Sequence, residues 1–244
     1  MPRRTREGET TVEERLVRLG LLVGEEGLAK LARAHVCVVG LGGVGGSCVM
    51  ALARSGVGEL TLIDGDAVEK SNFNRQAIAD EGTLGMPKPE AAAAKVAAVN
   101  PGIRVHGVSA RLTPENVAEF VPGDCDFIID CIDDMPVKVA LALFADGRGI
   151  AHVSSMGTAR KWHPERLAFA DIYSTKVCPV CKAMRKRLKD AGVERLQVLY
   201  SEEMPAVQVP GPGGDVPLGS TAFVPPVAGI MLAGHAVRTI LGVE

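Results

Sequence analysis

The sequence predicts an α/β protein with a Rossmann-like, doubly wound and mostly parallel sheet that carries helices on both faces. Short apolar runs alternate with helix-forming segments between residues 36 and 155, and the first run leads into a glycine-rich turn at 40–45. Apolar strands that alternate with helices form a parallel sheet covered on both sides. The order of the elements therefore indicates the fold class.

Each strand and helix of this first part has a local reason. The run 36–39 is rich in β-branched residues and ends at glycine, and the segment 43–55 after the turn predicts a helix. The alanine-rich helix expected at 88–99 is stopped by Asn100-Pro101-Gly102. The remaining patterns predict strands at 60–63, 103–108, 127–131 and 152–155, and helices at 114–120 and 137–145.

The alternation changes past Met156, where we expect a C-terminal extension that packs on the sheet. Apolar runs predict strands at 167–172 and 197–200, and a basic run predicts a helix at 181–189. The segment 205–217 holds four prolines and three glycines, which is typical of a loop. The apolar segment 228–241 predicts a closing helix.

The chain divides into three expected regions. These are an N-terminal helical arm (1–30), a nucleotide-binding core (31–160) and a substrate-side extension that continues the core (161–244). No apolar run reaches the roughly 18 residues of a membrane span, and the charged N-terminus has no apolar segment behind it. We therefore expect a cytoplasmic protein without a membrane partner.

Cysteines and charges narrow the function classes. Cys37, Cys48, Cys125 and Cys131 lie in apolar surroundings, so they do not indicate a disulfide framework. The net charge is only −2, but the stretch 151–189 has nine Lys or Arg residues against Glu165 and Asp171. This basic stretch favours an anionic partner.

The glycine turn predicts a phosphate site at Gly40, Gly42, Gly43 and Gly45. Such a turn lets the backbone approach a phosphate, and the following helix presents free N–H groups to the anion. Asp64 closes the second strand, where its carboxylate can accept from ribose hydroxyls. A merely tight turn is the alternative.

Two cations after Asp64 indicate ATP chemistry rather than hydride transfer. Arg75 and Lys88 lie where they can neutralise charge that develops on a triphosphate. A polar cluster of Asn72, Asn74 and Gln76 surrounds Arg75 in the sequence. Solvated surface cations are the alternative.

Carboxylates follow the fourth predicted strand in Asp130-Cys131-Ile132-Asp133-Asp134. Open parallel sheets bind ligands beyond the carboxyl ends of their strands, and Mg²⁺ takes carboxylate and phosphate oxygens. We assign Asp133 to the metal or phosphate and give Asp130 a structural role. The alternative is that Asp133 or Asp134 only caps the next helix.

These motifs together resemble the ThiF/MoeB-like, ubiquitin-activating-enzyme-like adenylating superfamily over about residues 15 to 160. The resemblance implies that ATP adenylates a carboxylate and that pyrophosphate leaves. It implies that Gly42 and Gly45 line the phosphates, that Asp64 holds the ribose and that Asp133 serves Mg²⁺. Phosphate contacts are implied for Asn72, Arg75 and Lys88.

The resemblance also implies a homodimer in which an N-terminal arginine reaches the ATP of the other subunit. Arg18 matches that position, and Arg15 matches it less closely. A solvated helix face is the alternative reading of both.

The number and spacing of the cysteines indicate which branch of the superfamily this chain resembles. Sulfur-carrier-activating members typically hold zinc with two C-x-x-C pairs, whereas Cys178-Pro179-Val180-Cys181 is the only pair in this chain. A thiolate at the start of the basic helix would be stabilised, which leaves open a redox or nucleophilic role with a sulfur-transfer or redox partner protein. Inert thiols, or a metal shared across a dimer axis, are the alternatives.

The second half resembles the tRNA threonylcarbamoyladenosine dehydratases, the TcdA or CsdL group. The similar stretches are 178–188, 198–203 and 219–225. The resemblance implies activation of the threonyl carboxylate of the modified adenosine beside the anticodon, followed by cyclisation with loss of water. An intramolecular cyclisation needs no protein nucleophile.

Basic and aromatic residues suit such an RNA. The cations expected to meet RNA phosphates, or else to form a solvated helix face, are Lys182, Arg185, Lys186, Arg187 and Lys189. An unpaired base could stack on Trp162, Tyr173 or Phe223, although a core role is equally open for each.

The sequence therefore favours an ATP-dependent tRNA dehydratase. A second hypothesis is an adenylyltransferase that activates the C-terminal Gly-Gly of a small sulfur-carrier or ubiquitin-like protein, which the missing second C-x-x-C disfavours. A third is a nucleotide-binding scaffold or a nicotinamide oxidoreductase, which Arg75, Lys88 and Asp133 disfavour.

Overall fold

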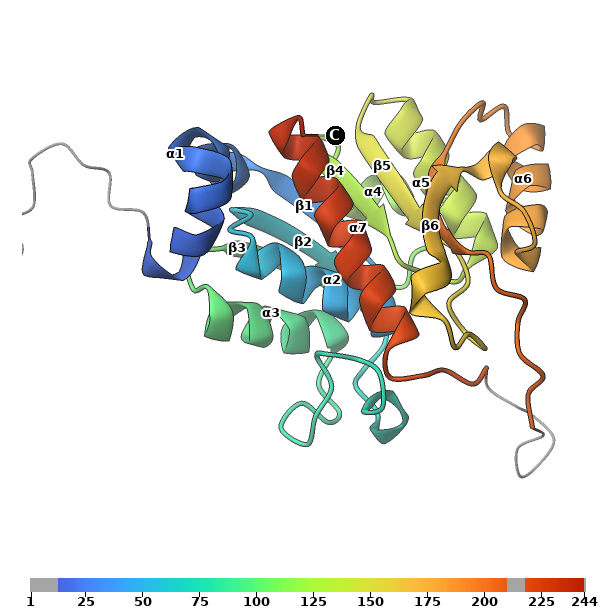
Figure 1. Cartoon of the computed structure of the whole chain (residues 1–244), viewed down its shortest axis with the longest axis horizontal. Coiled ribbons are helices and arrows are strands. Elements are labelled where there is room, and N and C mark those ends of the chain that lie inside the picture. Colours follow the sequence, from blue (N-terminus) through green and yellow to red (C-terminus); the bar gives the residue numbers. More distant parts are fainter. Residues whose placement is uncertain (1–12, 210–217, 244) are drawn as a thin grey trace, which may run out of the picture.

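The computed structural model describes residues 13–209 and 218–243 and contains a seven-stranded sheet in the order β3-β2-β1-β4-β5-β7-β6 (Figure 1). All neighbouring strands pair in parallel except β6 and β7, which are antiparallel. The strands are β1 (His35–Val39), β2 (Glu59–Ile63), β3 (Arg104–Val108), β4 (Phe127–Asp130), β5 (Ala151–Ser155), β6 (Leu167–Asp171) and β7 (Gln197–Ser201). The expected mostly parallel, doubly wound sheet is confirmed.

Seven α-helices are present in the described residues. They are α1 (Val17–Arg33), α2 (Gly43–Arg54), α3 (Lys88–Val99), α4 (Val117–Phe120), α5 (Met135–Asp146), α6 (Pro179–Asp190) and α7 (Val224–Leu241). Helix α7 begins four residues before the expected start at Ala228 because Pro225 and Pro226 occupy its first turn, where a missing N–H removes no helical hydrogen bond.

Helices cover both faces of the sheet. On one face α2, α3 and α7 pack over β1, β2 and β4 through a core that includes Val38, Leu52, Leu62, Ile129 and Leu232. On the other face α4 and α5 cover β1 and β4, and α6 extends this layer over β7. Figure 1 shows α7 lying across the sheet beside α2.

The direction of β6 was not specified by the sequence. Its register pairs Leu167 with Ser201 and Asp171 with Gln197, so β6 runs against β7 at the edge of the sheet. The apolar pattern of a strand is the same in both directions, and only its partner decides the direction. Strands β6 and β7 thus belong to the same sheet as the strands of the first half.

The division at 1–30, 31–160 and 161–244 stays a prediction, and parts of it lie outside the described residues, namely 1–12 and 210–217 of the expected loop. Helix α7 is long and apolar enough, by length and composition, to cross a membrane. In this structure its apolar side is used internally, since Ala228, Leu232, Ala233 and Ala236 are buried in the core beneath it.

Helix α7 packs very closely on α2 at one glycine. A Cβ on Gly229 would lie 2.1 Å from Val44 O and 2.8 Å from Cys48 N. Both are backbone atoms, which cannot move aside as a side chain can. The contact therefore ties the end of the chain to the helix that follows the glycine turn.

We expect Gly229→Ala to lower the free energy of unfolding by about 1–3 kcal/mol, because the added methyl overpacks the α2–α7 contact. Gly234→Ala is the matched control on the same helix. Its Cβ meets only the flexible Nη1 of Arg238 at 3.3 Å, so the better helix propensity of alanine should raise stability by up to about 1 kcal/mol. Urea unfolding measures the free energy of unfolding of both variants. Equal changes in Gly229→Ala and Gly234→Ala would contradict the close packing at Gly229.

Candidate active site

The glycine turn lies at the carboxyl end of β1, next to β4, where the strand order of the sheet reverses. Gly40 has φ +87° and donates its N–H to Ile63 O (2.8 Å). A Cβ on Gly45 would lie 1.7 Å from Gly40 O. Only glycine fits this crossing, and it places the first turn of α2 at the switch point, where open α/β sheets bind ligands.

The N-terminus of α2 is open to an anion. Its N-cap, Gly42, provides no side-chain cap for the first N–H groups of the helix. A Cβ on Gly42 would meet nothing closer than Gln76 Nε2 at 4.0 Å, so space remains above the turn. Free N–H groups with the positive end of the helix dipole behind them bind phosphate well.

Asp64 shapes the turn from the end of β2. Its Oδ2 accepts from Leu41 N (2.7 Å), and its Oδ1 accepts from Asp66 N (2.8 Å). The buried Lys88, the first residue of α3, places Nζ 3.0 Å from Asp66 Oδ2 and 3.9 Å from Asp64 Oδ1. The hydrogen bond from Lys88 lowers the pKa of Asp66. Asp66 was not among the expected site residues, although the D-G-D pattern at 64–66 could have revealed it.

The polar loop 72–76 lies against the turn. The Cβ position of Gly43 is 3.3 Å from Arg75 Cγ, and Arg75 Nη1 donates to Ser71 O (3.0 Å) and Asn74 Oδ1 (2.8 Å). The buried Asn72 accepts from Glu69 N (3.1 Å) and so shapes the loop itself.

Gln76 is buried at the end of this loop, and one polar atom of its side chain lacks a hydrogen-bond partner among the described residues. Within the described residues its Oε1 has no hydrogen-bond partner. A buried carbonyl oxygen without a donor is costly, so a ligand hydroxyl or amino group at this position would stabilise the loop. The turn, the open N-terminus of α2 and Gln76 together fit a nucleotide.

The structure distinguishes between the two aspartates after β4. Asp134 is the N-cap of α5 and accepts from Val137 N (3.0 Å). Asp133 is exposed, and no group of the described chain forms a hydrogen bond or ion pair with its carboxylate. The Cβ position of Gly40 lies 2.9 Å from Ile132 Cγ2, so the loop that carries Asp133 begins beside the glycine turn.

A buried ion pair supports that loop from below. Lys138 Nζ lies 3.0 Å from both carboxylate oxygens of Asp130 and also donates to Ser154 Oγ (3.1 Å) and Ser155 O (2.7 Å). Asp130 Oδ1 in turn accepts from Ile132 N (3.2 Å). The network joins the carboxyl ends of β4 and β5 to α5, in agreement with a structural role for Asp130.

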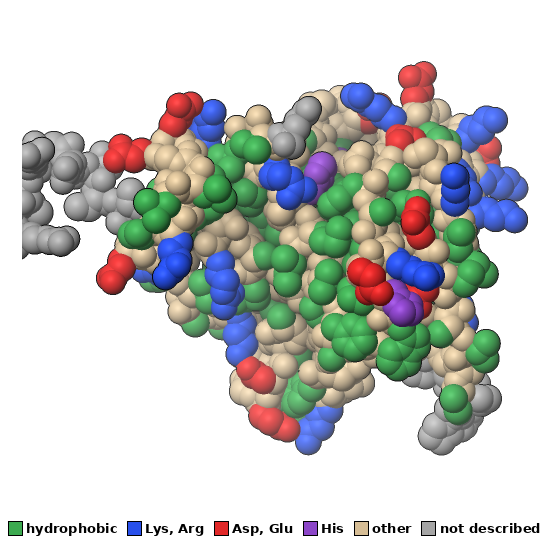
Figure 2. All heavy atoms as spheres, viewed as in Figure 1, with side chains coloured by type: hydrophobic (Ala, Val, Ile, Leu, Met, Phe, Trp, Pro, Cys, Tyr) green, Lys and Arg blue, Asp and Glu red, His purple; other side chains and the backbone are tan. Residues whose placement is uncertain are grey.

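Two groups of expected site residues lie elsewhere. Arg18 is exposed on α1, and α1 contacts the amino ends of the strands, where Leu16 packs at Gly56. The basic helix α6 covers the far edge of the sheet, and Figure 2 shows Lys and Arg side chains gathered over it. Its exposed cations are Lys182, Lys186, Arg187 and Lys189. Arg185 instead donates to Thr175 O (3.0 Å).

The Cys178 and Cys181 thiols are both buried at the start of α6. A hydrogen bond from the Cys181 thiol lowers the pKa of Cys178 to about 6, and the same contact raises the pKa of Cys181. In the part of the chain that the structure describes, no group of three or more His, Cys, Asp or Glu side chains could hold a metal ion. The second thiol pair of a zinc site is therefore absent there.

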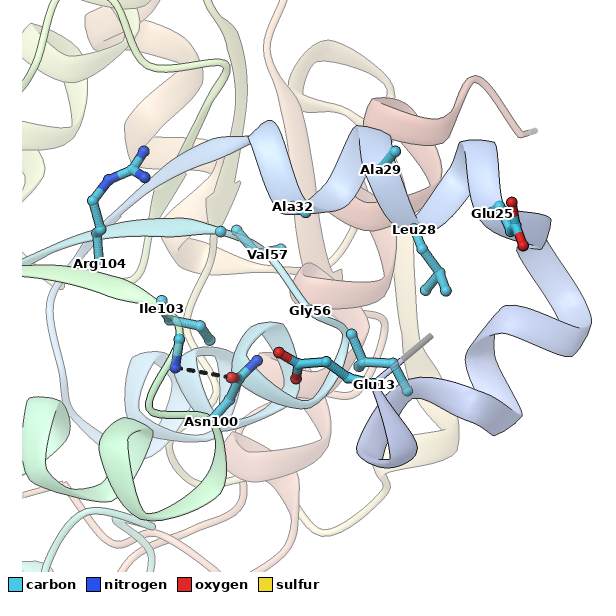
Figure 3. A pocket seen from close by; sticks show the side chains of 13 residues that line it. Glu13, Glu25, Leu28, Ala29, Ala32, Gly56, Val57, Asn100, Ile103 and Arg104 are labelled. Atoms are coloured by element: carbon cyan, nitrogen blue, oxygen red, sulfur yellow. Dashed lines mark hydrogen bonds between the residues drawn. The ribbon is translucent and has the colours of Figure 1, made fainter. Parts of the chain in front are cut away.

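A separate hollow of about 310 Å³ lies between α1 and the segments 56–58 and 100–104. Figure 3 shows Leu28 pointing from α1 into it, toward Glu13 and Asn100. These segments precede β2 and β3, so the hollow lies at the amino ends of the strands, away from the glycine turn. It is not part of the nucleotide site.

Comparison with known proteins gives matches along nearly the whole chain. The ThiF family matches residues 14–244. The Bacillus subtilis (strain 168) tRNA threonylcarbamoyladenosine dehydratase is 38% identical over 237 residues, which covers 91% of this chain and 92% of that protein. The crystal structure of the E. coli tRNA N6-threonylcarbamoyladenosine dehydratase in complex with ATP is 32% identical, with a TM-score of 0.86 and 94% of each chain covered.

Similarity to carrier-activating enzymes is shorter. The molybdopterin-synthase adenylyltransferase of Salmonella typhimurium (strain LT2) is 41% identical over 113 residues, which covers 46% of this chain and 45% of that protein. The similarity to the dehydratases therefore includes segments beyond those shared with this adenylyltransferase.

His152 should make stability depend on pH. It lies on β5 near Asp130 and Lys138, its Nε2 has no hydrogen-bond partner in the described residues, and burial lowers its pKa from 6.5 to about 4. Below pH 6.5 the imidazole of His152 binds a proton in the unfolded chain, whereas in the folded chain it stays neutral until the pH approaches 4. Stability should fall as the pH drops from 6.5 toward 4, by up to about 1.4 kcal/mol per pH unit.

His152→Leu should flatten this dependence, because leucine has a similar size and no proton to bind. Urea unfolding of both proteins between about pH 7 and pH 5 measures the difference. Parallel curves for the wild type and the variant would show that the imidazole titrates normally in the folded protein.

Proposed function

The chain belongs to the ThiF family, and from this we propose that it uses ATP to dehydrate the N6-threonylcarbamoyladenosine of tRNA to its cyclic form. One observation carries the assignment. The similarity to tRNA threonylcarbamoyladenosine dehydratases runs through the nucleotide half and the substrate-side extension alike. The glycine turn, Asp64, Arg75 and Lys88 supply the nucleotide site that this reaction needs.

The first step is adenylation. A carboxylate oxygen of the threonyl group attacks the α-phosphorus of ATP, the bond from that phosphorus to the pyrophosphate oxygen breaks, and an acyl-adenylate forms. The N–H groups of α2 bind phosphate oxygens, and Asp64 accepts from the ribose. Lys88 and Arg75 balance the charge that moves onto the leaving pyrophosphate.

The second step is cyclisation. The carbamoyl group attacks the activated carbonyl carbon and loses its N–H proton to water, and the bond from that carbon to the AMP oxygen breaks. AMP leaves with that oxygen, and the ring closes with the net loss of one water from the modified adenosine. Nucleophile and electrophile belong to the same side chain, so correct positioning supplies most of what the protein must add. No cysteine nucleophile is required, in keeping with the burial of Cys178 and Cys181.

Mg²⁺ is expected to bind at Asp133, where it would neutralise phosphate charge. Asp133 is exposed in the loop that begins beside the glycine turn, and no group of the described chain forms a hydrogen bond or ion pair with its carboxylate, which suits an ion that takes one or two carboxylates plus phosphate oxygens. Asp134 is already used as the helix cap and offers a matched control.

The test is an incubation of the protein with ATP, Mg²⁺ and either threonylcarbamoylated tRNA or a small carrier protein that ends in Gly-Gly. With the tRNA we expect AMP release, and we expect the modified adenosine to lose one water. Mass spectrometry of the nucleoside measures the loss of water. AMP formation with the carrier alone would favour the adenylyltransferase hypothesis and sink the dehydratase.

In the same assay Asp133→Ala should reduce turnover by about 100-fold or more, since it removes an electrostatic contact to the reacting phosphates. Asp134→Ala should keep its turnover and instead lose about 1 kcal/mol of stability with the cap. Equal turnover of the two variants would refute the role of Asp133. Arg75→Ala is expected to lose adenylation with the fold intact.

A homodimer is part of the proposal. On α1 the side chains of Leu21 and Leu22 are 86% and 82% exposed, and an apolar pair this accessible suits contact with a second copy. Arg18 lies on the same helix and would then reach the partner's ATP. A cytoplasmic location and a sulfur-transfer or redox partner stay predictions.

The basic helix α6 is proposed to bind tRNA phosphates. Its exposed Lys182, Lys186 and Lys189 follow one side of the helix, opposite the buried Met184 and Leu188. Arg185 is turned inward to Thr175 and is expected to hold the helix in place rather than to contact RNA.

Replacing Lys182, Lys186 and Lys189 by alanine should weaken tRNA binding. The slope of log affinity against log salt should fall by about one unit for each lysine that binds a phosphate in the wild type. Lys30→Ala on α1, which removes a surface cation paired with Glu26, is the control. A filter-binding titration at several salt concentrations measures the slopes. Unchanged slopes would place the RNA on another surface.

A further inference from the structure

Two aromatic side chains lie exposed beside the nucleotide site. Trp162, in the connection from β5 to β6, is 61% exposed, and Phe223, the N-cap of α7, is 44% exposed. Their ring centroids are 6.5 Å apart, with 47° between the planes. Figure 2 shows hydrophobic side chains gathered with a histidine near the lower end of α7. A core role is excluded by this exposure.

The backbone beneath Trp162 is held firmly. Its N–H donates to both carboxylate oxygens of the buried Glu203 (3.0 and 3.1 Å), and His163 N donates to Oε2 of the same residue (3.0 Å). The buried Lys161 donates to Glu203 O. These hydrogen bonds fix the backbone at Trp162, while its side chain stays exposed to a ligand.

Hydrogen bonds join this aromatic pair to the nucleotide site. Arg160 N donates to Gly219 O (2.8 Å), and Asn74 Nδ2 donates to Ser220 O (3.1 Å). Two residues after Phe223, Pro225 Cβ lies 3.0 Å from the Cβ position of Gly43. The pair, the loop that carries Arg75 and the glycine turn thus belong to one frame at the carboxyl edge of the sheet.

Charge and ring exposure together indicate the occupant. Trp162 belongs to the sequence stretch 151–189, which carries nine Lys or Arg residues against two acidic residues. Five of these cations lie on α6 at the far edge of the sheet, so they favour a nucleic acid as the partner of this half of the chain and do not surround the Trp162 ring. Unpaired RNA bases stack on exposed aromatic rings. Tyr173 does not belong to this pair, because its hydroxyl donates to Val193 O at the other end of β6.

We propose that Trp162 and Phe223 form the stacking platform for the base of the nucleotide whose side chain is activated. The proposal rests on the proposed function. The platform holds the purine so that its threonyl carboxylate reaches the ATP at the glycine turn, and the two rings act as positioning and specificity residues that leave the reacting atoms untouched.

Trp162 is the only tryptophan in the chain, so its fluorescence reports on the platform alone. The probe is a short anticodon stem-loop RNA that carries N6-threonylcarbamoyladenosine. We expect strong quenching with this RNA, and weaker quenching with the same RNA made abasic at the modified position. Equal quenching by both RNAs, or quenching only by a Gly-Gly carrier protein, would overturn the proposal.

Kinetics supply the second measurement. Trp162→Ala and Phe223→Ala should each raise the KM for the RNA by about 5- to 150-fold, the usual range for removal of one base stack, with the KM for ATP unchanged. Trp162→Phe should recover most of this effect. Leu143→Ala removes a 43% exposed apolar side chain on α5 and should change neither constant.

The outcomes separate the two proposals. A wild-type enzyme that yields no cyclic nucleoside would defeat the proposed function. A wild type that yields it, combined with an unchanged KM for RNA in Trp162→Ala, would defeat only the platform. Because the Trp162 ring is exposed, this variant should keep the thermal midpoint of the wild type, and it carries the test even if Phe223→Ala fails to fold.

Discussion

The close crossing of Gly45 over Gly40 O is the constraint on which the site depends. A side chain at Gly45 would meet that carbonyl oxygen at 1.7 Å, so α2 can follow β1 directly only through glycine. The crossing directs the uncapped N-terminus of α2 to the switch point of the sheet. Asp64, Arg75 and the loop after β4 then reach the same turn by short contacts.

Two buried lysines near this turn serve different purposes. Lys138 is surrounded by four oxygen acceptors from β4 and β5, so its ammonium is fully used in holding the sheet edge. Lys88 has one close carboxylate, on Asp66, and a second at 3.9 Å on Asp64. A buried charge needs a partner, and in the proposed reaction Lys88 would keep one throughout by binding a phosphate oxygen beside its carboxylates.

The return of α7 across the first half connects the proposed substrate platform to the proposed nucleotide site. Gly229 lies against the backbone of α2, Pro225 lies against Gly43, and Phe223 begins the helix beside Trp162. The proposed substrate platform and the proposed nucleotide site are therefore held by the same hydrophobic core. For a cyclisation within a single substrate side chain, such fixed placement is the main contribution that a protein can make.

The sequence by itself determined the strands, the helices and the nucleotide motif, because these follow from apolar periodicity and from glycines that no other residue can replace. It also placed Asp64 and Asp133 at strand ends. The tertiary structure decided the rest: the direction of β6, the choice of Asp134 as the helix cap, the pairing of Lys88 with Asp66 and the inward turn of Arg185. Most of these depend on groups that the fold brings together from distant parts of the chain, and local pattern does not specify such partners.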